Sequence, residues 1–257
     1  MSFQRSSFVR RTAAACLLLV LPLHAALGAK PPELVVLPAS ARVGVLNLLD
    51  AEVTHFHAAR RVQDSALKTE PVGWSVPAML LETLRAPLTK LGYTPVPLSP
   101  DAALLRAREP CFLDANLQKA LSRECAATYG QLLSSEHLAA LIVLGPGLND
   151  STHAQGTRRK DLPEYLRGWC VISGLEGAGA PLLLNLSELL LVRAGEKGAE
   201  LSARAWGGAY AQSWTEYRAP PDARALPAGA AEQLQPLFAG LLQRQSDGLL
   251  VHLGPAH

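Results

Sequence analysis

The sequence predicts an α/β or α+β fold, a mixed β-sheet covered by helices, in a single domain that follows an N-terminal targeting segment. Three observations lead to this prediction. Short apolar runs typical of buried strands recur along the chain, amphipathic helical patterns lie between and after them, and the first 28 residues have the composition of a signal peptide. We therefore expect a signal peptide at 1–28 and one mixed domain at 29–257 that ends in an amphipathic helix.

The targeting segment has the three parts of a cleavable bacterial signal peptide. Arg5, Arg10 and Arg11 form a positive start without acidic residues, and residues 12–23 are almost wholly apolar. Small residues at 26 and 28 suit cleavage after Gly28. The apolar run of about 12 residues is short for a bilayer core of about 30 Å, so an uncleaved anchor is the alternative that we favour less.

The same segment argues for Sec-type export and against lipidation. Cys16 opens the apolar run, whereas a lipidated cysteine follows such a run. Arg10 and Arg11 precede Thr-Ala-Ala-Ala rather than the bulky apolar pair of twin-arginine signals. We expect the mature protein to be periplasmic or secreted, and the periplasm and the extracellular space stay equally open.

Composition excludes several classes of partner for the mature chain. Nearly half of all residues are apolar and fewer than a fifth are charged, which is typical of a packed globule. The full chain has a formal charge of +2, and removal of the three arginines of 1–28 leaves −1. A surface this close to neutral gives no reason to expect nucleic acid. No apolar run after residue 28 is long enough for a transmembrane segment.

The N-terminal half of the domain alternates strands and helices. We predict strands at 42–49 and 53–62, a polar loop at 63–75 and a third strand at 93–98. A helix begins after Ser75, places leucines at 80, 84, 88 and 91 on one face, is kinked by Pro87 and ends at Gly92. Residues 102–108 form a helical turn, and Asp114 caps a second helix that reaches residue 129.

The C-terminal half is richer in strands. Residues 139–144 are the clearest core strand, apolar on both faces, and a further strand covers 167–175. A β-hairpin joins 183–193 to 200–211 through the glycine-containing turn 194–198. An irregular connection at 214–227 leads to an amphipathic helix at 230–250, which Pro236 interrupts.

The cysteines after residue 28 fit an oxidising compartment. Cys111 and Cys125 form a plausible disulfide across a short loop, worth about 3 kcal/mol in the chain-entropy model. Cys170 lies in the apolar run Trp-Cys-Val-Ile and is expected to be a buried free thiol. Three unpaired cysteines are the alternative, because the sequence alone does not show that the Cβ atoms meet.

His55 and His57 are the best candidate for a chemical site. Residues i and i+2 of a strand point to the same face, so the two imidazoles would lie side by side as ligands of a divalent metal often do. Asp50 and Glu52 have the opposite parity, which leaves His137, His153 or a distant carboxylate as the third ligand. The alternative is a pair of ordinary surface or pocket histidines.

Other motifs favour structure over catalysis. Residues 145–150 (Gly-Pro-Gly-Leu-Asn-Asp) lack the final glycine of a dinucleotide fingerprint and the Gly-Lys-Ser/Thr of a P-loop, so we interpret them as a turn. Ser65 and Lys68 match Ser-x-x-Lys, yet they fall in a predicted loop and no Lys-Thr-Gly follows. We assign no catalytic residue, and an enzyme is the less favoured interpretation.

Two segments carry a resemblance. Val-Gly-Val-Leu-Asn-Leu-Leu at 43–49 and Val-Thr-His-Phe-His at 53–57 resemble the opening of uncharacterised secreted proteobacterial proteins. More loosely, the order of elements is similar to α/β modules of envelope assembly lipoproteins, of the curli-secretion and penicillin-binding-protein activator type. Those proteins carry a lipid-anchoring cysteine that this chain lacks. The resemblance implies a non-catalytic binding role in the cell envelope with a protein partner, and a metal-binding protein or metal-dependent enzyme using His55 and His57 is the alternative.

Overall fold

The computed structural model describes residues 34–59, 65–112, 120–147, 162–163, 165–174, 180–209, 211–217 and 225–257. The predicted signal peptide at 1–28, the helix cap at Asp114 and the possible ligand His153 lie outside the described residues. The described strands are β1 (Arg42–Asn47), β2 (Glu52–His57), β3 (Ala66–Pro71), β4 (Thr94–Leu98), β5 (Ala140–Pro146), β6 (Gly168–Ser173), β7 (Leu182–Gly195), β8 (Gly198–Trp206) and β9 (Ala211–Ser213). The described helices are α1 (Val76–Lys90), α2 (Ala102–Phe112), α3 (Arg123–Ser135) and α4 (Ala230–Leu250), with a 3-10 turn, η3, at Gly207–Ala209.

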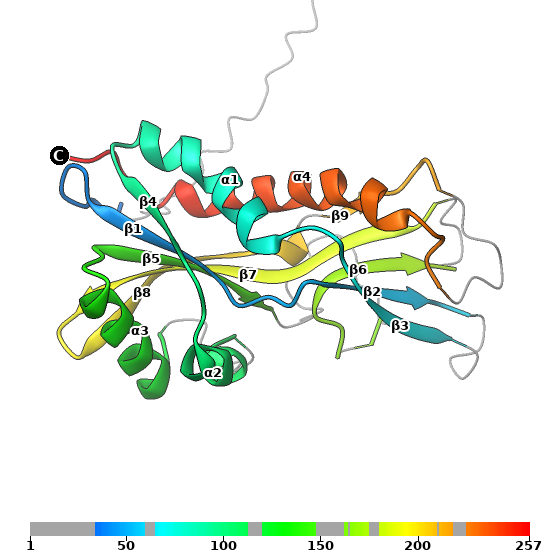
Figure 1. Ribbon diagram of the computed structural model, residues 1–257, viewed down its shortest axis with the longest axis horizontal. Coiled ribbons are helices and arrows are strands. Elements are labelled where there is room, and N and C mark those ends of the chain that lie inside the picture. The colour runs from blue at the N-terminus through cyan, green and yellow to red at the C-terminus, as the bar shows by residue number, and fades with distance from the viewer. Residues whose placement is uncertain are drawn as a thin grey trace, which may run out of the picture. The chain divides into compact units, whose positions relative to one another are not determined.

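The strands form one mixed parallel and antiparallel sheet, which confirms the predicted fold class (Figure 1). β7 has 14 residues, and four other strands pair with it. Along one of its edges β6 pairs with Leu182–Leu186 and β5 with Ser187–Arg193, both antiparallel. β1 and β2 continue the sheet beyond β5 and β6, and β4 and β3 form the outer edge.

The other edge of β7 also changes its pairing partner near the middle of the strand. β8 pairs with Glu188–Gly195 and β9 with Leu182–Leu184, and η3 connects the two strands. The sheet therefore has two halves, one built on β1, β4, β5 and β8 and the other on β2, β3, β6 and β9. Among the described strands, β7 alone belongs to both halves.

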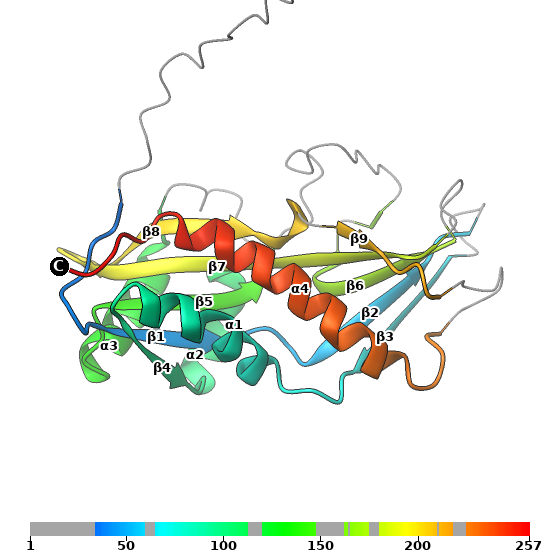
Figure 2. The same cartoon turned by 90° about the horizontal axis from the view of Figure 1, so that it is seen from above.

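Helices cover the two faces unequally (Figures 1 and 2). α1 and α4 pack on the face that carries Leu183, Leu189 and Leu191, and their apolar side chains join those of the strands in the largest core cluster. α2 and α3 pack on the opposite face, against a cluster that includes Leu190 and Val192 of β7. This second pair lies under the β1–β5 half only. The β2–β6 half buries a smaller separate cluster around Phe56, Cys170 and Ile172.

Local sequence explains why α1 begins where it does. The Ser75 hydroxyl accepts a hydrogen bond from the Ala78 N–H at 3.3 Å, and Pro77 stands in the first turn, where no donor is needed. Leu80, Leu84 and Leu88 are fully buried on one face, as the spacing predicts. Pro87 does not end the helix, which continues to Lys90.

A polar cluster fastens α4 to the sheet where the two halves meet. Asn185 and Ser187 of β7 face Gln245 of α4, and all three side chains are fully buried. Asn185 Nδ2 donates to Gln245 Oε1 at 2.9 Å, and the Ser187 hydroxyl donates to Asn185 Oδ1 at 2.6 Å. Gln245 Nε2 donates to the carbonyls of Ser187 at 3.1 Å and Ala205 at 2.9 Å. These bonds satisfy groups that would be costly to bury alone.

Three local predictions are wrong. The segment 63–75, predicted as a loop, contains β3, an edge strand with four of its six residues exposed. The predicted helix 114–129 is not continuous, because residues 120–122 are not helical and α3 begins at Arg123, after the N-cap Ser122. Pro236 does not interrupt α4, because it stands in the second turn of a continuous helix.

Candidate functional site

The two candidate histidines lie on one face of β2, as their spacing predicts. His55 and His57 point to the same side of the sheet as Val53, and they are 1% and 5% exposed. β6 runs parallel to β2 and places its last residue, Ser173, directly beside His57. The Ser173 hydroxyl is 2.8 Å from His55 Nε2 and 2.9 Å from His57 Nδ1. The structure thus joins the two imidazoles through one buried hydroxyl.

The number of hydrogens available determines how the Ser173 hydroxyl bonds the two imidazoles. Ser173 has one proton, so it donates to one imidazole nitrogen and accepts from an N–H of the other ring. Both bonds form only if one of the two facing nitrogens carries a hydrogen and the other does not. Two neutral rings meet this condition. Within the described residues, His55 Nδ1 is a buried atom without a hydrogen-bond partner.

Burial sets the protonation state of His55. Desolvation lowers its pKa, the nearby His57 lowers it further, and Glu70 on β3 partly opposes both effects. The resulting pKa is about 4, below the ordinary value of 6.5. His55 is therefore neutral at pH 7, with a nitrogen lone pair available to a hydrogen-bond donor or a metal.

The described residues supply no third metal ligand. No group of three or more His, Cys, Asp or Glu side chains in the described ranges is placed to hold an ion. Asp50 forms an ion pair with Arg108 at 2.6 Å, and Glu52 has the parity that points away from the histidines. His137 lies just before β5 and is too far away. Ala140, at the start of β5, pairs with Arg193 of β7, and Ile172, next to Ser173, pairs with Leu182. These two positions of β7 are 11 residues apart, or roughly 35 Å.

The arrangement of Ser173 and His55 is not that of an activated serine. The distance suits a nucleophile and its base, but Ser173 is only 2% exposed. In the described residues, no carboxylate bonds His55 Nδ1 to orient the ring. The Ser65 hydroxyl accepts from the Ala59 N–H at 3.1 Å, and Lys68 pairs with Glu70 at 2.5 Å, so Ser-x-x-Lys forms no catalytic pair.

A groove lies beside the histidines on the same face of the sheet. Directly opposite residues of β2 and β3 share a face, so Glu70 stands next to Val53 and Lys68 next to His55. The first turn of α4 closes the groove from above, and its volume is about 190 Å³. The lining is mainly apolar, with the Glu70 carboxylate as its one charged side chain among the residues that form it: Val53, Glu70, Pro71, Val72, Trp74, Leu226, Pro227, Ala228, Gly229, Ala230, Ala231 and Leu234.

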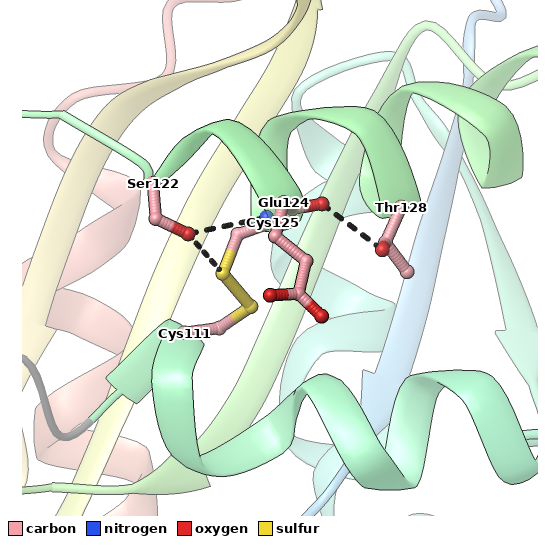
Figure 3. Close-up of a disulfide and its surroundings, with 5 residues drawn as sticks. All are labelled: Cys111, Ser122, Glu124, Cys125 and Thr128. Carbon is pink, nitrogen blue, oxygen red and sulfur yellow. Dashed lines mark hydrogen bonds between the residues drawn. A yellow bond between two sulfur atoms is a disulfide. The ribbon is translucent and has the colours of Figure 1, made fainter.

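The predicted disulfide is present and joins two helices (Figure 3). Cys111 in the last turn of α2 bonds to Cys125 in the first turn of α3, with the Cα atoms 5.6 Å apart. The Ser122 hydroxyl accepts from the Cys125 N–H at 3.2 Å and lies 3.0 Å from its sulfur. Cys170 is a buried free thiol, as expected, and burial raises its pKa to about 12.

Gly145 has a packing role. It lies within β5, and a Cβ at this position would be 2.5 Å from the ring of Phe112 on α2. The glycine therefore lets α2 approach the sheet closely. Gly147 follows the strand and donates its N–H to the Leu186 carbonyl at 2.9 Å. The predicted turn at 145–150 is therefore wrong for Gly145 and Pro146, which end β5, and residues 148–150 lie outside the described residues.

Sequence reasoning missed Ser173 and the groove. Ser173 carries one weak signal, since it is the polar residue that ends the apolar run Trp-Cys-Val-Ile. The groove depends on β3, which was not predicted as a strand.

Comparison with known proteins adds no relative. No family model matches the chain, and neither the curated proteins nor the solved structures contain a significant match. None of the described helices is long and apolar enough to cross a membrane. The case for function therefore depends on the geometry of this chain.

Burial of His55 predicts that stability depends on pH. Between about pH 6.5 and pH 4 the unfolded chain binds a proton at His55 that the folded chain does not. The free energy of unfolding should therefore fall as the pH is lowered through this window, by up to about 3 kcal/mol from this residue. Urea unfolding at pH 7 and pH 4.5 measures the effect, and His55→Gln should remove its contribution.

An NMR titration of the wild-type protein gives a second measurement that needs no variant. The His55 ring signal should titrate near pH 4. A midpoint near 6.5, with equal pH dependence of unfolding in wild type and His55→Gln, would contradict the proposed burial effect.

Proposed function

We propose that the mature protein works outside the bacterial cytoplasm, in the periplasm or beyond, as a non-enzymatic protein that binds a partner in the cell envelope. The observation that carries the first part is the Cys111–Cys125 disulfide between α2 and α3. Structural disulfides persist in oxidising compartments, and the cytoplasm keeps such thiols reduced. The composition of residues 1–28 supports the same compartment.

The groove at the start of α4 supports the second part. Most of its lining residues have apolar side chains and Glu70 is the one charged residue among them, which suits the side chain of a bound protein better than a polar metabolite. The volume of about 190 Å³ matches one or two apolar side chains rather than a cofactor. We infer that an envelope protein inserts an apolar side chain here while its backbone lies along the surface.

Export and disulfide formation give a direct prediction. Protein recovered from the periplasm should begin at Ala29, because the small residues 26 and 28 direct cleavage after Gly28. A thiol reagent should label no cysteine of the folded protein, one after denaturation, and three after denaturation with reductant, since only Cys170 is free and it is buried. Intact mass spectrometry reads both results. An unprocessed Met1 terminus, or three thiols without reductant, would refute export.

Blocking the groove tests partner binding. Ala228 is exposed and lines the groove, so Ala228→Arg should fill it without disturbing the core. In crosslinking from envelope extracts, we expect the partner captured by wild type to be reduced at least about tenfold with this variant. Ala86→Arg, at an exposed position of α1, is the matched control. Equal capture by the two arginine variants, or no captured partner at all, would argue against the groove.

Metal binding by His55 and His57 is the second candidate. The observation in its favour is that two imidazole nitrogens converge on one hydroxyl, at 2.8 and 2.9 Å, and that His55 is neutral at pH 7. A divalent ion bound there would either be coordinated by the Ser173 hydroxyl or displace it from the two imidazoles.

Elemental analysis decides the metal question. After dialysis against zinc and then buffer, a true site should retain about one ion per chain in wild type and none in the double variant His55→Ala/His57→Ala. His137→Ala, roughly 35 Å away along the sheet, should retain the wild-type content. Retention well below one ion, or equal retention in the double variant, would exclude the metal site.

A further inference from the structure

β3 offers an open edge of the sheet. It pairs with β2 on one side, and no other described strand pairs with it (Figures 1 and 2). Leu67, Lys68 and Thr69 are exposed, and the exposed fraction of the apolar Leu67 is 47%. An unpaired edge presents backbone N–H and C=O groups to any strand that fits beside it.

The other long edges are protected in ways that β3 is not. β4 carries Pro95 and Pro97, which have no N–H to donate to a further strand. The ladder between β7 and β8 contains an irregularity at Leu191 and Val192, and α3 packs closely on β8. In β3 the five residues from Ala66 to Glu70 include no proline, and its pairing with β2 is regular throughout.

We propose that β3 pairs antiparallel with β3 of a second copy of this chain, which makes one continuous sheet across a two-fold axis. An isologous contact of this kind brings the same strand from both copies together in opposite directions. Directly opposite residues of an antiparallel pair point to the same face, whereas neighbouring residues of a strand point to opposite faces. The two-fold axis must therefore pass beside one residue, which then faces its own copy, and not between two residues. Registers centred on Lys68 or Thr69 pair five residues of β3, whereas those centred on Leu67 or Glu70 pair only three.

Charge selects one of these registers. Centring on Lys68 places lysine against lysine, and centring on Glu70 places glutamate against glutamate. Centring on Thr69 places each Lys68 opposite Glu70 of the second copy. Opposite charges across a strand pair stabilise it and like charges destabilise it. Both side chains already lie on one face and pair within the chain, at 52% and 30% exposure, so they are available at this edge.

The same charges explain selectivity. Charged edge residues discourage pairing with unrelated strands, which place apolar groups or like charges opposite them. A strand with the reverse order of charges is the exception, and β3 read in the opposite direction has that order. The Thr69 register also places the exposed Leu67 opposite Pro71 of the second copy, which covers part of the Leu67 side chain. Pro71 has no N–H, so at this pair only its carbonyl bonds, to the Leu67 N–H, while the Thr69 pair forms both of its hydrogen bonds.

Charge reversal and restoration test the proposal on the mature protein by sedimentation velocity over a range of concentrations. Wild type should form dimers. Lys68→Glu and Glu70→Lys each create two like-charge contacts per dimer and should raise the dissociation constant at least about tenfold. The double variant Lys68→Glu/Glu70→Lys restores opposite charges and should return to within about threefold of wild type. Glu82→Lys, at an exposed ion pair of α1, is the control and should dimerise as wild type does.

A disulfide trap checks the register. Thr69 lies on the proposed axis, so mild oxidation of Thr69→Cys should give a covalent dimer, and Glu82→Cys should not. A wild-type protein that stays monomeric at all concentrations would overturn the proposal. So would a dimer that both single variants leave unchanged, a double variant that fails to recover, or a Thr69→Cys protein that forms no crosslink.

Discussion

The continuity of β7 is the constraint on which the rest of the structure depends. Its first residues pair with β6 and β9, and its later residues pair with β5 and β8. Both halves of the sheet are therefore joined through this one strand. The change of partners falls at Leu186 and Ser187. Next to this change of partners β7 carries buried polar side chains on both faces, and they are paired. Asn185 and Ser187 bond Gln245 on one face, and Glu188 pairs with Arg204 on the other.

This junction also decides where α4 lies. Gln245 holds the helix over the middle of the sheet through bonds to β7 and β8, and the apolar residues Leu234, Phe238 and Leu242 complete its contact. The N-terminal turn of α4 then reaches the β2–β3 end and closes the groove. The proposed binding surface is thus a consequence of how the helix is fixed more than 10 residues away along the chain.

The histidine cluster follows from the same division. β6 ends at Ser173, one residue beyond Ile172, which pairs with the first residue of β7, and Gly174 follows with a positive φ. The parallel register of β2 and β6 then places this last residue next to His57. Both imidazoles bond the Ser173 hydroxyl there. Their burial, more than any reaction chemistry, accounts for the lowered pKa of His55.

The features that sequence predicted are those with a local cause. Apolar runs gave β5 and β7, the Ser75 cap gave α1, and strand parity placed His55 beside His57. The disulfide was predicted because the short spacing of its cysteines suits an oxidising compartment. Export, the envelope partner and the family resemblance stay predictions.

The features that it missed need long-range information. β3 is polar and half solvated, so its sequence has neither an apolar run nor a clear alternation, and only pairing with β2 makes it a strand. Ser173 meets His57 across 116 positions of sequence, a register that no local pattern contains. The groove combines both difficulties, since it requires β3 and the start of α4 together.

Native-state hydrogen exchange along β7 tests the central claim most directly. If this strand makes the two halves one cooperative unit, the slowest amides of Leu182–Leu186 and those of Leu189–Arg193 should open with the same free energy, equal to that of global unfolding. A clearly lower opening free energy for the segment paired with β6 would show that the β2–β6 half unfolds on its own, and β7 would then not be the element that unites the sheet.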